Sequence, residues 1–264
     1  MKFMIALDLE GVAGIVGLPN SSLGDSPKEY EFACREGARE ANAAAEALFM
    51  AGATEVCLWD NHGTGVNLDP DTVDPRCRLL QGSGAGRWPG LTPDYAGVLL
   101  IGYHAMAGTP AAILAHSYDS TVYQSMSIHG ENVGEIAIDA HMAGLQGVPV
   151  LFVASDDKGV AEAKRIMPWV HCVATKQAYG RNAACSLSPT ETARCIKVAV
   201  QKAVEDLSSM RTFAFARPLH VCYRMTRLEY AEQAEREAHA QRLDAYTVAW
   251  DVAELTELFG KSTW

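Results

Sequence analysis

Two acidic side chains near the N-terminus, Asp8 and Glu10, have the type and spacing to hold a metal ion. They continue the apolar run of residues 3–7, which predicts a buried β-strand. Because residues two apart on a strand point to the same face, we expect the two carboxylates to lie side by side. Such a pair repels itself unless a cation lies between the groups. Considered alone, the pair has a second interpretation, since acidic residues often end strands as turn formers or helix N-caps.

Two histidines follow other predicted strands at the point where each strand ends. His62 comes after residues 55–59, and His104 comes after residues 97–101. Ligand sites in open α/β sheets form beyond the carboxyl ends of the strands, so we expect these histidines to meet the two carboxylates there. One such histidine is more often bonded within its own loop, but two beside a carboxylate pair favour a metal site.

Glu135 is the fifth candidate ligand, at the start of a predicted helix over residues 134–144. Its alternative role is that of a carboxylate favoured at a helix N-terminus. A set of imidazoles and carboxylates without a thiolate is typical of hydrolytic zinc, although manganese and cobalt also fit it.

Several short motifs occur in the order and at the separations found in a known family. They are LDLEG (7–11), DNHG (60–63), GYHAMAGTP (102–110), AHS (115–117), VGE (133–135), PVLFVASDD (149–157) and TKQAYGRNAACSLSP (175–189). On these motifs, residues 1–205 resemble the D-aminopeptidases of the bacterial dipeptide-transport operon type. The residues after 205 match that family only in their general pattern.

The resemblance implies a zinc-dependent peptidase that releases N-terminal D-residues from short peptides. It places a paired zinc site, with two Zn²⁺ per chain, on Asp8, Glu10, His62, His104 and Glu135. Two such ions about 3.5–4 Å apart, bridged by Asp8, would activate water near neutral pH. It also implies that His116 acts as a nucleophile or a base, and we favour acid–base catalysis because imidazole titrates near neutral pH. The family assembles as rings stacked into a barrel, which implies a homo-oligomer, a decamer, whose sites face an inner channel.

Other functions fit the same residues. A metal-dependent amidase or esterase acting on non-peptide substrates would use the same site. A metal- or peptide-binding module without turnover is disfavoured by the intact ligand set and by His116. Two-metal sites also hydrolyse phosphate esters, but the chain lacks the GxxxxGK[ST] loop of P-loop NTPases. We therefore predict an aminopeptidase acting on short peptides or amino-acid amides.

Polar residues outside this set have less specific roles. Lys176, Arg181 and Asn182 are candidates to bind a peptide carboxylate or an oxyanion, although a solvated face is an equally good interpretation. Asp156 is predicted to cap a helix and not to bind metal. Glu40, on a long predicted helix, either orients a ligating histidine or packs at the edge of the core.

Short apolar runs alternate with helical stretches, which predicts an α/β fold with a mixed or mostly parallel sheet flanked by helices. The expected strands are residues 3–7, 55–59, 97–101, 121–128, 148–154, 170–174, 219–223 and 244–249, with a hairpin turn at 129–132. The expected helices are residues 28–50, 134–144, 158–167, 228–242, one from Ser188 and one from Asp251. We expect a metal-binding catalytic α/β domain over residues 1–208 and a smaller C-terminal α/β portion over residues 209–264.

The overall composition disfavours several classes of partner. With 22 basic and 32 acidic side chains, the formal net charge is −10, which disfavours nucleic acid and anionic membrane surfaces. The N-terminal run lacks the cleavage site of a signal peptide, and no apolar run approaches the roughly 20 residues of a membrane span. Seven cysteines form no CxxC pair, which argues against a disulfide framework. We therefore expect a cytoplasmic protein.

Overall fold

Two β-sheets of different size organise the chain in a computed structural model that describes residues 1–21, 23–84 and 86–259. Sheet A has the strand order β3-β2-β1-β4-β7-β8-β9. Its strands are β1 (Lys2–Leu7), β2 (Glu55–Asp60), β3 (Arg78–Leu80), β4 (Tyr95–Ile101), β7 (Val150–Asp156), β8 (His171–Gly180) and β9 (Ala183–Ser186). Neighbouring strands are parallel except for β8 and β9. The predicted mostly parallel sheet is confirmed.

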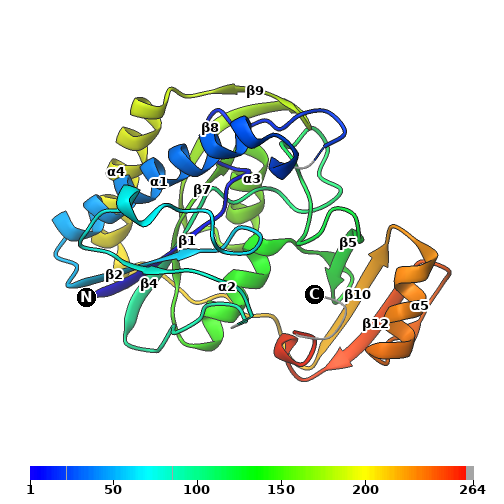
Figure 1. Ribbon diagram of the computed structural model, residues 1–264. Coiled ribbons are helices and arrows are strands. Elements are labelled where there is room, and N and C mark those ends of the chain that lie inside the picture. The colour runs from blue at the N-terminus through cyan, green and yellow to red at the C-terminus, as the bar shows by residue number, and fades with distance from the viewer. Residues whose placement is uncertain (22, 85, 260–264) are drawn as a thin grey trace.

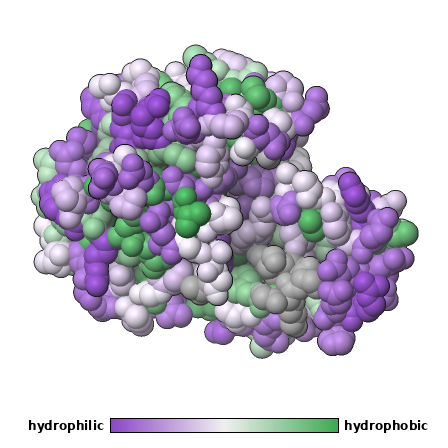
Figure 2. All heavy atoms as spheres, viewed as in Figure 1, coloured by the Kyte–Doolittle hydropathy of each residue, from purple (hydrophilic) through white to green (hydrophobic). Residues whose placement is uncertain are grey.

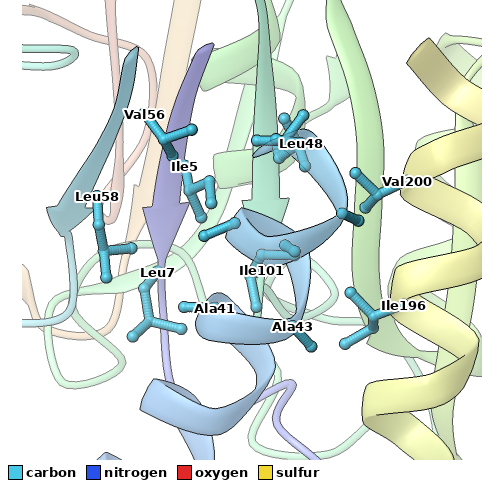
Figure 3. Packing of buried hydrophobic residues seen from close by; sticks show 14 of the residues in the cluster. Ile5, Leu7, Ala41, Ala43, Leu48, Val56, Leu58, Ile101, Ile196 and Val200 are labelled. Carbon is cyan, nitrogen blue, oxygen red and sulfur yellow. The ribbon is translucent and has the colours of Figure 1, made fainter. Parts of the chain in front are cut away.

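Helices cover both faces of sheet A (Figure 1). They are α1 (Pro27–Met50), α2 (Glu135–Leu145), α3 (Asp157–Ile166) and α4 (Pro189–Glu205). Helices α1 and α4 pack on one face, to which β1 contributes Ile5 and Leu7, and Figure 3 shows these side chains against the alanine-rich side of α1. The alternate residues of β1, Met4 and Ala6, lie in the core with α2 and α3 on the other face. Because the strands are buried on both faces, they read as continuous apolar runs in the sequence.

Sheet B is antiparallel and has the order β11-β12-β10-β5-β6. Its elements are β5 (Tyr123–Ile128), β6 (Glu131–Asn132), β10 (Leu219–Met225), α5 (Leu228–Glu237), β11 (Gln241–Arg242) and β12 (Thr247–Val252). Buried and exposed residues alternate along β10, so one face of the sheet packs against α5 while the other is polar. Sheet B takes two strands from before residue 208, and the division of the chain at that residue stays a prediction.

The part with sheet B stands beside the larger part with sheet A, and Figure 2 shows the surface hollowed between them. Hydrophilic side chains cover much of the outer surface of the smaller part in that view. In the described part of the chain, no helix has both the length and the hydrophobicity needed to cross a bilayer.

The differences from the predicted elements concentrate in the C-terminal region. The helix predicted from Asp251 is wrong, because Asp251 lies in β12 and pairs with His220 of β10. The helix predicted over 228–242 ends at Glu237, since the chain turns there toward β11. The periodicity also did not indicate β3 or β9. Pairing with a neighbouring strand stabilises these segments, and a local pattern contains no information about that neighbour.

Candidate metal centre

The candidate ligands lie on loops beyond three parallel strands and at the start of α2. Strand β1 ends before Asp8, so Asp8 and Glu10 lie in the turn that follows, and the prediction that they continue the strand is wrong. As expected, His62 follows β2 and His104 follows β4. Glu135 is the first residue of α2. Because β2, β1 and β4 are neighbours in sheet A, their carboxyl ends bring these side chains together.

The loops after β1 and β4 contact each other through their main chains. The N–H of Asp8 donates to the carbonyl oxygen of Ile101 at 2.8 Å, and that of Gly11 donates to the carbonyl oxygen of Gly102 at 2.7 Å. Gly102 has a φ of +71°, and a Cβ at this position would lie 2.0 Å from the main-chain carbonyl oxygen of Asp8. Only glycine fits there, and the close approach sets the position of Asp8 beside the loop that carries His104.

Two histidines connect the three carboxylates of the cluster, each at ion-pair distance from two of them. His62 Nδ1 lies 2.9 Å from Asp8 Oδ1 and 3.2 Å from Glu10 Oε2. His104 Nε2 lies 3.4 Å from Asp8 Oδ2 and 3.4 Å from Glu135 Oε1. The two oxygens of Asp8 therefore face different histidines.

The hydrogen bonds of two histidines define which ring nitrogen faces the cluster. His104 Nδ1 is 3.0 Å from the carbonyl oxygen of Ala105, and His116 Nδ1 is 2.9 Å from that of Leu114. A carbonyl oxygen only accepts, so each Nδ1 carries a hydrogen and donates it. When neutral, each ring directs its Nε2 lone pair toward the cluster, where His116 Nε2 lies 4.0 Å from Glu135 Oε1. The two rings stack with centroids 4.0 Å apart.

The carboxylates favour positive charge among the imidazoles. Burial opposes a charge on His104, but Glu135 and Asp8 outweigh it and raise the pKa of His104 to about 10. Burial, together with the charge of Glu10, raises the pKa of Asp8 to about 7. Burial also acts on Glu135, yet the adjacent imidazole of His104 and its charge lower the pKa of Glu135 to about 2. A divalent cation meets the same requirement for positive charge.

Two sets of donor atoms are close enough to hold an ion. One set comes from Asp8, Glu10 and His104, the other from His104, His116 and Glu135, and the atoms of each set lie within 4.8 Å of one another. Glu10 Oε2 and His104 Nε2 are buried without a hydrogen-bond partner among the described residues. Buried polar atoms normally have a partner, so these donors fit a divalent metal ion such as zinc. His62 joins the cluster through Asp8 and Glu10, and His116, predicted to be a catalytic residue, belongs to the second set of donors.

The remaining polar candidates make hydrogen bonds within the protein. Lys176 Nζ donates to the carbonyl oxygens of residues 10, 12 and 15 at 2.6–2.7 Å, which leaves it no hydrogen for a substrate. Arg181 donates to the carbonyl oxygen of residue 115, and Asn182 to that of residue 16. Asp156 caps α3, as predicted. Glu40 accepts the N–H of residue 13 and contacts no histidine of the cluster among the described residues.

A second buried network beside the cluster was missed by the sequence analysis. Arg87 pairs with Asp139 of α2, and the hydroxyl of Tyr103 donates to the same carboxylate at 2.5 Å. Asn61, next to His62, donates to the Tyr103 hydroxyl at 2.8 Å. Arg87 lies in a segment without regular structure, and nothing in its sequence surroundings indicates that it is buried against α2.

A mostly parallel α/β sheet with a buried cluster of carboxylates and imidazoles beyond its strand ends is typical of metal-dependent hydrolases. Comparison with known proteins specifies the class further. The profile of peptidase family M55, described as D-aminopeptidase, matches residues 1–262. The chain therefore belongs to the M55 D-aminopeptidase family, and the resemblance inferred from the motifs is confirmed.

Two further comparisons support the same assignment. A D-aminopeptidase of Bacillus subtilis (strain 168) is 35% identical over 199 residues, which are 74% of this chain and 71% of the relative. A solved structure, described as the Zn-dependent D-aminopeptidase DppA from Bacillus subtilis, a self-compartmentalizing protease, matches with a TM-score of 0.89 and 29% identity. That match covers 97% of this chain and 93% of the other. The predicted fold class and aminopeptidase function are confirmed.

Proposed function

We propose that this chain is a zinc-dependent aminopeptidase that releases the N-terminal D-residue from short peptides or amino-acid amides. The observation that carries the proposal is the buried cluster in which His104 belongs to both sets of donors. The ligands assigned to two zinc ions are Asp8, Glu10, His62, His104 and Glu135. The zinc dependence in the description of DppA supports the choice of metal.

The side chains prepare the site for zinc and for a peptide. When bound, zinc supplies Lewis-acid activation of water and of the scissile carbonyl. Asp8 presents one oxygen to His62 and the other to His104, so it is the bridging ligand of our proposal. The bond from His104 Nδ1 to the main chain holds that ring with Nε2 toward the cluster. Glu135 is held in turn by the N–H of Tyr118, which donates to Oε1 at 2.8 Å.

His116 is assigned the proton transfers of the reaction. Burial and the adjacent His104 lower the pKa of His116, so the ring is neutral near pH 7 and its Nε2 can accept a proton. It takes a proton from the attacking water and delivers it to the amine that leaves when the peptide bond breaks. The bond to Leu114 keeps Nδ1 protonated and Nε2 toward Glu135 throughout.

We place this enzyme in the cytoplasm as a homo-oligomer, a decamer of stacked rings. The description of DppA as self-compartmentalizing supports an assembly that encloses its sites. All seven cysteines are free, as expected in a reducing compartment. Sedimentation velocity tests the assembly, since a decamer has ten times the 28.5 kDa of one chain. A monomer at assay concentration would contradict this part of the proposal.

Elemental analysis of the purified protein, with parallel assays of D- and L-alanyl p-nitroanilide, tests the catalytic proposal. We expect two zinc ions per chain, D-selective release and loss of activity on chelation. His104→Ala should lose zinc, whereas His239→Asn, a change at an exposed histidine, should retain it. Bound zinc without cleavage of either stereoisomer would contradict the aminopeptidase and favour the amidase or esterase alternative. Failure to take up zinc on reconstitution would contradict the ligand assignment.

A further inference from the structure

A cavity of about 660 Å³ lies beside the metal centre. Its lining includes Asn61 and Gly63, on either side of His62, and Tyr118, whose N–H donates to Glu135. The volume is within the range of about 300–1,000 Å³ that is typical of sites for small molecules. A substrate whose scissile bond lies at the cluster therefore has room to continue into this cavity.

The walls of the cavity contribute little charge. Trp59, Pro89 and Phe259 supply apolar surface, and several glycines expose main chain without side chains. Asp60 also lines the cavity, but its carboxylate accepts the N–H groups of Asn67 and of the residue after it, at 2.6 and 2.9 Å. Its charge is thereby compensated by the loop that follows β2.

Arg87 is the one cationic side chain among the described residues that line the cavity. Its Nε donates to Asp139 Oδ1 at 2.8 Å and its Nη2 donates to Oδ2, so the guanidinium is fixed from one side. The rings of Trp59 and Tyr118 lie 4.9 and 5.4 Å from its Cζ. Its third nitrogen, Nη1, has no hydrogen-bond partner among the residues that the structure describes. The side chain keeps 15% of its surface exposed, whereas that of Asp139 is fully buried.

Asp139 does not cancel the hydrogen-bonding capacity of Arg87. The carboxylate of Asp139 also accepts the hydroxyl of Tyr103. It binds only two of the three guanidinium nitrogens of Arg87. A guanidinium held in this way is preorganised, because little side-chain freedom is lost when a ligand binds. The available nitrogen suits an anionic oxygen, since charge-assisted hydrogen bonds to carboxylates are stronger than neutral ones.

We propose that this cavity is the subsite for the C-terminal part of a short peptide, and that Arg87 binds the terminal carboxylate. The inference rests on the proposed aminopeptidase function, which places the N-terminal residue at the metal centre. It predicts that peptides with a free C-terminus are preferred, because an amide or ester at that end lacks the charge that Arg87 binds. The aromatic and glycine walls accommodate the residue that precedes this carboxylate.

A pair of substrates tests the subsite in the unmodified enzyme. D-alanyl-glycine has a terminal carboxylate, and its C-terminal amide is nearly the same size without the charge. We expect KM for the amide to exceed KM for the acid by about 10-fold to 100-fold, the factor that corresponds to a hydrogen bond to a charged group, with similar kcat. Equal KM values would overturn the proposal and indicate a cavity that recognises only side chains.

A conservative substitution tests whether Arg87 is the group responsible. Arg87→Lys keeps a cation beside Asp139 but removes Nη1, the guanidinium nitrogen that Asp139 does not use, so the ratio of the two KM values should fall toward one. Arg76→Lys is the matched control, because Arg76 binds Asp74 through the same two nitrogens on the surface. The control should keep the ratio of the unmodified enzyme. An unchanged ratio in Arg87→Lys would overturn the assignment of Arg87.

Calorimetry separates a failure of the subsite from a failure of the proposed function. The protein used is the full chain with His116→Ala, so that the bound peptide is not consumed. Binding of D-alanyl-glycine at least 10-fold tighter than its amide supports the subsite even if no peptide is cleaved by the unmodified enzyme. Equal affinity overturns the subsite, while cleavage of D-alanyl p-nitroanilide, which has no carboxylate, still supports the aminopeptidase.

Discussion

Lys176 is a buried cation that supports the metal centre through hydrogen bonds to the main chain. Its side chain is 2% exposed, and Nζ donates to the carbonyl oxygens of Glu10, Val12 and Ile15. Burial lowers its pKa to about 8, despite the charges of Glu40 and of other carboxylates nearby. The ammonium therefore acts as a fixed support for the turn that carries Glu10.

Replacing this lysine should destabilise both the fold and the metal centre. In Lys176→Met the three carbonyl oxygens lose their donor inside the protein, which should lower the free energy of unfolding by about 3 kcal/mol or more. The turn should loosen, so zinc affinity should fall as well. Urea denaturation and zinc titration measure the two effects. Lys197→Met, which removes an exposed ion pair with Glu46, is the control, and equal losses in both variants would contradict this role.

His116 should be required for turnover and not for metal binding. Its removal in His116→Ala should lower kcat by a factor of about 10²–10⁴, the usual contribution of a general acid–base residue. Zinc content, measured by elemental analysis, should stay at the level of the unmodified protein. Because His116 lies among the possible ligands, loss of one zinc ion in this variant would instead identify it as a ligand.

At the scale of elements, the contact between the loops after β1 and β4 decides the geometry of the cluster. Gly102→Ala would bring a Cβ to 2.0 Å from the main-chain oxygen of Asp8, at a φ of +71°. We expect a loss of stability well above the roughly 1 kcal/mol typical of left-handed strain, together with weaker zinc binding.

A second glycine in the same loop is the matched control for this substitution. Gly108 has a φ of +82°, but a Cβ there would meet nothing within 4 Å. Gly108→Ala should therefore cost only the backbone strain, and it should leave zinc affinity unchanged. Thermal unfolding and zinc titration of both variants compare the two costs. Equal losses of stability and equal zinc affinity in the two variants would contradict the prediction. They would show that the contact between the loops after β1 and β4 is not needed for zinc binding.

At the scale of the whole molecule, His141 joins the two parts of the chain. It lies on α2, and its Nε2 donates to Glu254, which follows β12, at 2.7 Å. Its Nδ1 accepts the N–H of Phe215 at 3.2 Å, so both nitrogens are used by a neutral ring. Burial lowers the pKa of His141 below its usual value of 6.5, although Glu254 acts in the opposite direction.

This histidine should make the stability of the protein depend on pH. Below about pH 6.5 the unfolded chain gains a proton that the folded ring resists, so stability present above this pH is lost as the pH falls. His141→Gln should be slightly less stable at pH 8, since it loses the acceptor for Phe215. Between pH 8 and pH 5.5 it should lose less stability than the unmodified protein, as measured by urea midpoints. His239→Asn should keep the original slope, and the same slope in all three proteins would contradict the assignment.

The sequence by itself determined the α/β class, five of the seven strands of sheet A and the identities of the candidate ligands. These features depend on local patterns: apolar runs that must be buried, a serine before Pro189 that caps α4, and polar residues after strand ends. The order and separations of the family motifs up to residue 189 indicate the resemblance, and the family match confirms it. The C-terminal strands were partly misjudged, because the pairing of Asp251 with His220 is not visible in either segment alone.

Only the tertiary structure decided how the side chains meet. Asp8 and Glu10 converge through a turn held by Lys176, a contact between residues more than 160 positions apart. The burial of Arg87 against Asp139 likewise joins a loop to a helix 52 positions away. Such contacts depend on the arrangement of the strands in the sheet. They also depend on which hydrogen-bond donors still lack a partner when the sheet forms. Neither is a property of a short segment of sequence.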